Sequence, residues 1–314
     1  MLSLLPVVCA VWLAAGAKAP DKPSFNRHTG LYEPPFSELE RAVGSGDRAD
    51  VARWAARIGP ARLAEALRGG DRGKTVAALE ATELLPGNVR LLDAVTPLVG
   101  SGDVALAERA VRALGQMLDA GEPKRLEEWD VPVDAVHRGC RALADAAGRS
   151  QAALELRLAA IEALADATLL CRPAPLSLLG DAAPPVRRAV LLAQRVRDEI
   201  PAPALKQALG DADPGVVSAA AVAWCRHRLI AGPKPPTAAE LTRLPAAPPG
   251  PSPIPPLREL AAAEATAVED AVELLPCLAA STDAADKQAL EQLKKSKVPA
   301  VKARAAELGP SKGK

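Results

Sequence analysis

Apolar residues recur every three or four positions through most of this chain, which is the spacing of one face of an α-helix. In one segment the apolar face comprises Ala107, Ala110, Val111, Leu114 and Leu118, while the charged residues between them point elsewhere. Aromatic residues make up only 2% of the sequence, and strands favour aromatic and β-branched residues. The pattern therefore predicts an all-α protein.

The helical pattern also repeats along the chain with a period near 30 residues. Gap-free copies begin at Leu156, Val186 and Val216 with 30-residue spacing, earlier copies begin at Thr75 and Ala107, and a degenerate copy begins at Val301. Shorter partner helices are expected over Val89–Val99, Leu176–Leu179 and Ala204–Leu209. One such helix pair cannot bury its apolar face alone, so the pairs are expected to stack. A single compact, irregular helical domain is the alternative.

Aspartates precede the second helix of three copies, at Asp103, Asp181 and Asp211, where they are expected to cap the helix start. Proline follows Asp181 and Asp211 near the first helical positions, which tolerate it. These openings resemble the second helix of HEAT-type repeats from about Gly70 to Leu229. The resemblance implies an α-solenoid that serves as a binding platform. Val217 stands where the family usually has arginine, so a regular ladder of Asp–Arg pairs is not expected throughout.

The first 17 residues are typical of a secretory signal. An uncharged apolar run is followed by the small-x-small site Ala15-Gly16-Ala17, and the run is shorter than the ~20 residues of a bilayer span. No basic residue precedes the run, so an atypical signal, a start further upstream and a buried apolar helix are the alternatives. We expect an exported protein, periplasmic or secreted, with membrane attachment only if the segment is not cleaved.

Composition predicts four further regions before the C-terminal tail. They are an extended aromatic arm at 18–36, repeats at 37–230, a linker at 231–256 and C-terminal helices at 257–309. Ten of the 25 residues from Gly232 to Pro256 are proline, which favours extended polyproline II. The C-terminal helices are expected over Leu257–Leu275, Asp283–Lys295 and Val298–Leu308 and could either dock on the repeats or hang from the linker. Residues 310–314 form a basic tail.

Four cysteines follow the signal: Cys140, Cys171, Cys225 and Cys277. An even number in an oxidising compartment favours two disulfides. If a helix pair reverses near Gly148, Cys140 lies opposite Ala159, so Cys171 is expected beyond disulfide reach. A bridge between Cys225 and Cys277 across the Pro-rich segment is the favoured pairing, and buried free thiols are the alternative.

No pattern of catalytic residues stands out. The chain has no GxSxG, HExxH or CxxC motif. Gly69–Thr75 resembles a phosphate-binding loop, but the required first glycine would fall on Arg68, so an inter-helix turn is predicted. A net charge of +1 argues against a nucleic-acid binder. We therefore predict no enzymatic activity, cofactor or metal.

The predicted function is a non-catalytic scaffold that binds a protein or peptide partner on the repeat surface. Candidate contacts are exposed arginines of the second helices, because arginine suits carboxylates and extended peptides. These are Arg109, Arg112, Arg157, Arg187, Arg188 and Arg226. The alternatives are a structural spacer of the cell envelope without a specific ligand and a helical-repeat enzyme such as a lyase-like protein.

Overall fold

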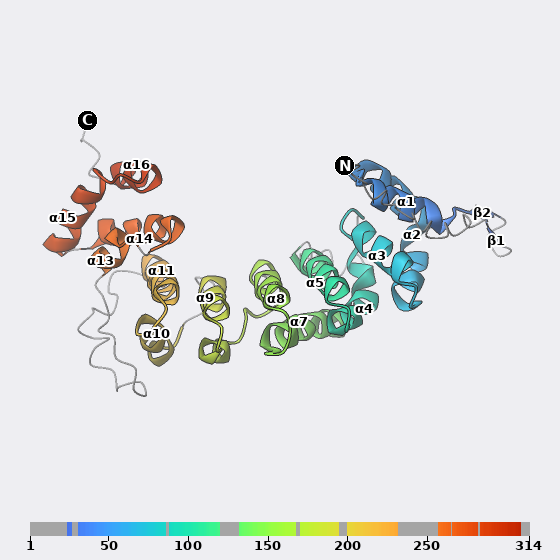
Figure 1. Ribbon diagram of the computed structural model, residues 1–314, viewed down its shortest axis with the longest axis horizontal. Coiled ribbons are helices and arrows are strands. Elements are labelled where there is room, and N and C mark those ends of the chain that lie inside the picture. Colours follow the sequence, from blue (N-terminus) through green and yellow to red (C-terminus); the bar gives the residue numbers. More distant parts are fainter. Residues whose placement is uncertain are drawn as a thin grey trace, which may run out of the picture. The chain divides into compact units, whose positions relative to one another are not determined.

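The computed structural model describes residues 24–26, 31–85, 88–119, 132–167, 170–194, 200–231, 257–264, 266–281 and 283–308. The predicted signal segment, the Pro-rich stretch 232–256 and the basic tail lie outside the described residues. The chain forms two compact units, residues 1–85 and 86–314. Helices make up nearly all of the described regular structure, which confirms the helical prediction (Figure 1).

The first unit opens with a short antiparallel hairpin. Strands β1 (Ser24–Asn26) and β2 (Leu31–Glu33) pair with Phe25 opposite Tyr32. The backbone of these residues of the predicted arm is extended, and the two segments pair with each other as strands. Phe36, assigned to the same arm, instead begins helix α1 (Phe36–Ser45) and is buried with Leu39 and Ala42 at helical spacing.

Two further helices complete the first unit: α2 (Arg48–Arg68) and α3 (Arg72–Thr82). The α2 helix bends at Gly59, which has a φ of 80° that glycine tolerates, and Pro60 follows without an N–H for the helical ladder. Asp71 caps α3 by accepting from the amides of Gly73 and Lys74. The glycine-rich stretch before α3 is thus the predicted inter-helix turn.

The second unit begins with helices arranged in two layers (Figure 1). One layer contains α5 (Val104–Asp119), α8 (Leu154–Asp166), α9 (Pro184–Ala193) and α11 (Pro214–Ala231). The other contains η1 (Asn88–Leu91), α4 (Leu92–Val95), η2 (Thr96–Gly100), α7 (Val133–Gly148), η3 (Leu176–Gly180) and α10 (Ala202–Leu209). Within the first layer α5 packs on α8, α8 on α9 and α9 on α11.

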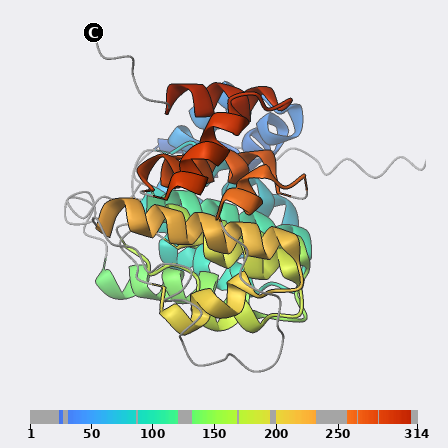
Figure 2. The same ribbon diagram turned by 90° about the vertical axis from the view of Figure 1, so that its left-hand side faces the viewer.

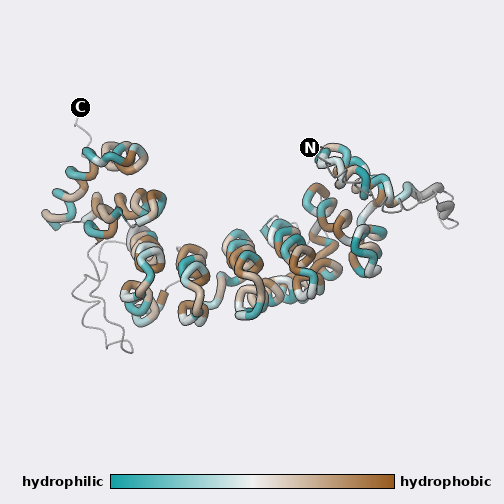
Figure 3. Tube along the Cα trace, in the orientation of Figure 1, coloured by the Kyte–Doolittle hydropathy of each residue, from teal (hydrophilic) through white to brown (hydrophobic). Residues whose placement is uncertain are grey.

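The core lies between and within these layers. The predicted apolar face of α5, from Ala107 to Leu118, is almost completely inaccessible. Gly115 allows α5 to approach α8 closely, because a Cβ added there would lie 2.7 Å from Cβ of Ala163. Every residue from Val216 to Cys225 on α11 is buried. In Figure 3 hydrophobic and hydrophilic stretches alternate along the helices of both layers, as expected for helices with a buried face.

The C-terminal residues form α13 (Leu257–Ala262), α14 (Val268–Ala280), α15 (Ala284–Leu293) and α16 (Pro299–Glu307). The α14 helix packs on α11, and Figure 2 shows this group, coloured orange to red, beside α11. The prediction of one helix over Leu257–Leu275 was wrong. In an unbroken helix Glu264 would fall within the buried stripe of Leu257, Leu260 and Leu275, whereas the break leaves Glu264 exposed.

Candidate binding groove

Two arginine–aspartate bridges connect successive helices of the layer that contains α8, α9 and α11. Arg157 of α8 donates to both carboxylate oxygens of Asp181, which precedes α9. Arg187 of α9 donates to Asp211, which precedes α11, through Nε at 2.8 Å and Nη2 at 2.7 Å. Each pair spans 24 residues, and the second lies 30 residues after the first. The same contact therefore recurs with the period of the sequence.

Both bridges are largely withdrawn from water. The exposed fractions are 5% for the Arg157 side chain and 11% for that of Asp181. The hydrogen bonds from Arg157 lower the pKa of Asp181 below its ordinary value. Burial alone would raise the pKa of Asp211, but the hydrogen bonds from Arg187 and from the Asp213 amide lower it overall. Both aspartates are therefore held ionised against their arginines.

The structure corrects the expected capping role of two aspartates. Asp181 accepts from the amide of Ala183 at 2.9 Å, but Ala183 occupies the N-cap of α9. Asp211 likewise accepts from the amide of Asp213, and it is Asp213 that accepts from the Val216 amide in the first turn of α11. The periodic aspartates thus stabilise the turn before the helix, and both oxygens of each carboxylate also accept from the arginine of the preceding helix in the layer.

The arginine ladder stops at Val217, which is buried on α11 in place of an arginine. A different contact connects α9 to α14. Arg188 donates to Asp270 of α14, with an Nη2–Oδ1 distance of 3.0 Å, and also to the carbonyl of Gly215. Ser218 donates its hydroxyl to Asp270 at 2.6 Å. Asp270 is 3% exposed, and its carboxylate raises the pKa of Arg188.

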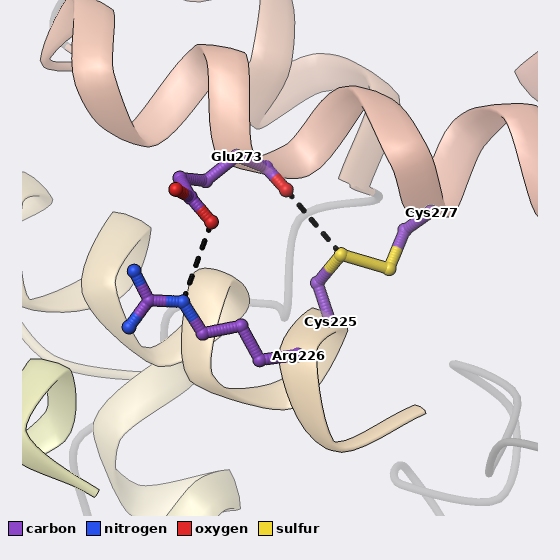
Figure 4. Close-up of a disulfide and its surroundings, with 4 residues drawn as sticks. All are labelled: Cys225, Arg226, Glu273 and Cys277. Atoms are coloured by element: carbon purple, nitrogen blue, oxygen red, sulfur yellow. Dashed lines mark hydrogen bonds and ion pairs between the residues drawn. A yellow bond between two sulfur atoms is a disulfide. The ribbon is translucent and has the colours of Figure 1, made fainter. Parts of the chain in front are cut away.

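A disulfide and an ion pair lie along the same α11–α14 interface (Figure 4). Cys225 is joined to Cys277, with their Cα atoms 5.8 Å apart. This is the pair that the sequence analysis favoured. Next to it, Arg226 Nε donates to Glu273 at 3.3 Å. The C-terminal helices are therefore attached to α11 by covalent, ionic and apolar contacts.

The second disulfide joins Cys140 to Cys171, which the sequence analysis placed out of reach. That expectation was wrong because it extended the second helix past its true end. The α8 helix stops at Asp166, and the amide of Cys171 donates to the carbonyl of Ala167 as the chain turns. The turn brings the Cα of Cys171 to 5.4 Å from that of Cys140.

The structure also changes the interpretation of the six candidate arginines. Arg157, Arg187, Arg188 and Arg226 donate to carboxylates of this chain. Arg157 is buried, so the expectation of an exposed charge was wrong there. Arg112 is exposed on α5, and Arg109 lies half-buried on the same helix. The six side chains are not brought together in one site.

A groove with a volume of about 470 Å³ lies instead between α8 and α9. Its walls are mainly apolar and half-buried. The lining residues are Leu158, Ile161, Glu162, Ala165, Pro185, Arg188, Ala189, Leu192 and Ala193. This groove was not predicted from the sequence. The available signal was that α8 carries apolar residues on more than one face, which exceeds what a single buried stripe requires.

Glu162 and Arg188 are the two charged residues that line the groove. Arg188 is engaged by Asp270, whereas Glu162 is exposed and has no ion pair or hydrogen bond within the described part of the chain. Glu155 and Asp166 lie on the same face of α8, at helical spacing from Glu162, and are also exposed. The unneutralised charge of the α8 surface at the groove is therefore negative.

Within the described residues, no group of three or more histidine, cysteine or acidic side chains is placed to hold a metal ion. None of the helices in the same residues is both long and apolar enough for a membrane span.

No protein-family model and no curated protein matches the chain. Among solved structures, one match is the crystal structure of an engineered protein from a structural genomics programme. It is 18% identical, and the match covers 87% of this chain and 94% of that one with a TM-score of 0.29. A match at this level carries no argument about function.

Proposed function

We propose that this protein is an α-solenoid of HEAT-type repeats that acts as a non-catalytic, exported scaffold. The recurrence of the Arg157–Asp181 contact as Arg187–Asp211, 30 residues later, supports the repeat assignment. The ordered packing of α5, α8, α9 and α11 in one layer also supports it.

The groove between α8 and α9 carries the proposed binding function. Monomeric proteins rarely leave large apolar surfaces exposed, and apolar grooves that remain open to water are typical of binding sites. Leu158, Ala189 and Leu192 line this groove and remain partly exposed. The partner is a segment of another protein that inserts apolar side chains between the two helices.

A photo-cross-linking residue in place of Leu192 tests this assignment in the cells that make the protein. We expect a discrete protein adduct, and a second variant with Ala189→Phe should lose it because the larger side chain fills the groove. The matched control carries the cross-linker in place of Val133, which is 66% exposed on α7. If Leu192 gives no adduct, or the same adducts as Val133, the groove is not the binding surface and the spacer function is favoured.

Export is the second part of the proposal. Two disulfides support it, because disulfides persist mainly in oxidising compartments. The mass of the exported protein should correspond to cleavage after Ala17 and should increase by four hydrogens on reduction. Retention of residues 1–17 would contradict signal cleavage, and free thiols in the exported chain would contradict the disulfide argument.

A further inference from the structure

The groove between α8 and α9 is lined by one basic and one acidic side chain, and within the part of the chain that the structure describes only the basic one is already paired. Arg188 is the basic residue in the lining, and its guanidinium already donates to Asp270, Gly215 and Ser218. Glu162 lies in the same lining without an ion pair in the described residues. A ligand that enters the groove therefore encounters a carboxylate with no competing partner.

The end of α8 strengthens this negative charge. Asp166 is the last residue of the helix, and Glu162 lies one turn before it on the same face. The C-terminus of a helix carries a partial negative charge from its unpaired carbonyls, so acidic side chains there are unfavourable for the helix and attractive to a cation. No basic residue is present in the last turn of either α8 or α9.

Charged residues near the groove do not make its net charge positive. Arg112 is exposed on α5, which packs on α8 and does not line the groove. Arg187 on α9 is neutralised by Asp211. Arg226 on α11 donates to the carbonyl of the lining residue Leu192, but its charge is paired with Glu273. Residues 195–199, which follow α9 in the sequence, contain two arginines and two carboxylates and so have no net charge.

The geometry of the groove limits the form of its ligand. Backbone groups of α8 and α9 are hydrogen-bonded along the helices, so this site has no open strand edge to which an extended peptide could add. Two neighbouring helices present side-chain ridges that a third helix can fit. The α8 helix has 13 residues, and a ligand helix of the same length would extend for about 20 Å.

We infer that the groove binds an amphipathic helix of a partner protein whose apolar stripe is bordered by lysine or arginine. The apolar stripe lies against Leu158, Ala189 and Leu192. The basic side chains pair with Glu162 in the groove lining and with Asp166, which is exposed one turn further along the same face of α8. This inference rests on the proposed scaffold function and adds to it the charge of the partner. It replaces the sequence-based expectation of arginines that recognise carboxylates.

The test uses the full chain with both disulfides formed and two fluorescent helical peptides, each as long as α8. One contains leucine and lysine in an amphipathic pattern, and the other has glutamate in place of lysine. We expect only the basic peptide to bind. Its affinity should fall between about 0.01 M and about 0.15 M salt, because the Debye length shortens from about 30 Å to about 8 Å.

Variants connect the binding to the groove. Glu162→Gln should weaken binding of the basic peptide about two- to five-fold, as expected for one exposed ion pair, and Glu162→Lys should weaken it further. Ala189→Phe should abolish binding. The matched control is Glu259→Gln on α13, which removes an exposed carboxylate outside the groove lining and should leave the affinity unchanged.

The inference is overturned if the acidic peptide binds as well as the basic one, if neither binds, or if Glu162→Lys has no more effect than Glu259→Gln. These results leave the proposed scaffold function to be judged separately by the adduct at Leu192. An adduct there, combined with insensitivity to Glu162→Lys, would retain the groove as a binding surface and reject a basic partner.

Discussion

The α8–α9 and α11–α14 interfaces belong to the same compact unit, but different contacts hold the two pairs of helices together. Between α8 and α9, Arg157 reaches Asp181 in the turn before α9, and an apolar groove remains open to water. Between α11 and α14, the Cys225–Cys277 disulfide and the hydrogen bond from Ser218 to Asp270 cross the contact. Arg188 of α9 also pairs with the buried Asp270 carboxylate. All ten residues of α11 from Val216 to Cys225 are buried.

Chain connectivity explains this difference. A single turn region joins α8 to α9 with its short 3₁₀ partner, whereas α11 and α14 are separated by the Pro-rich stretch. Closing a longer loop costs more conformational entropy. A cross-link removes part of that cost by restricting the unfolded chain. The strongest contacts therefore lie where the connection is long, and the surface left open lies where the connection is short.

Removal of the Cys225–Cys277 disulfide between α11 and α14 should cause the largest loss of folding stability. With 52 residues between Cys225 and Cys277, the loop-entropy relation gives a loss of about 4 kcal/mol for a Cys225→Ala, Cys277→Ala variant. Urea unfolding followed by circular dichroism measures the loss. Hydrogen exchange should show increased opening in α14 and little change in α5.

The matched control removes the other disulfide with Cys140→Ala and Cys171→Ala. Its separation of 31 residues predicts a similar global loss, also about 4 kcal/mol, but the increased exchange should appear in α7 and in the chain after α8. If both variants loosen α14 equally, the Cys225–Cys277 bridge has no special role in holding the C-terminal helices.

Loss of the buried carboxylate at the same interface should have the next largest effect. Asp270→Asn weakens the charged hydrogen bonds that the carboxylate accepts from Arg188 and Ser218, which should cost about 2 kcal/mol. The loss stays below that of a fully buried ion pair, because the Arg188 side chain is 28% exposed. The control is Glu269→Gln, which removes the neighbouring exposed carboxylate of α14. Urea midpoints of the two variants give the comparison, and equal midpoints would show that the Arg188 contact adds little.

The helix pairs were predictable from the sequence because their apolar spacing and 30-residue period are local features. The positions of Leu156, Val186 and Val216 predicted α8, α9 and α11. The break between α13 and α14 was missed because no glycine or proline marks it. The alanines around it favour a helix, but an unbroken helix would bury the carboxylate of Glu264, and the break keeps that side chain exposed.

The candidate site was less predictable, because exposure depends on tertiary partners. Arg157 and Arg112 look alike in the sequence, yet Arg157 is buried against Asp181 and Arg112 is exposed. The Cys140–Cys171 bridge depends on the turn after Asp166, which apolar periodicity does not encode. The groove residue Glu162 was not singled out, because an exposed glutamate on a helix is common.

Acid should weaken the arginine ladder of α8, α9 and α11. The pKa values of Asp181 and Asp211 are lowered in the folded protein, so the unfolded chain binds more protons as pH falls. Their contribution to stability is present above the unfolded pKa of about 4 and is lost as pH falls through the lower folded values. Urea midpoints measured from neutral pH downward should decrease most steeply below about pH 4.

The control for acid unfolding is Asp181→Asn. This variant starts less stable, because Arg157 loses its charged partner, but it has one fewer lowered carboxylate to protonate. Its midpoint should therefore decrease less steeply than that of the wild-type protein over the same acidic range. Parallel curves would mean that the Arg157–Asp181 bridge does not contribute to the acid sensitivity.

The smallest expected effect concerns the α8–α9 interface, where the groove is open to water. Asp166 ends α8 with a negative charge at the negative end of the helix, so Asp166→Asn should stabilise the protein by about 0.3–1 kcal/mol. Thermal unfolding measures the gain, and Asp145→Asn on α7 is an exposed carboxylate control that should give a smaller one. A gain in stability together with weaker binding of the basic peptide would show that Asp166 serves recognition at the expense of the fold. A loss of stability would instead give Asp166 a structural role and leave Glu162 as the recognition charge of the groove.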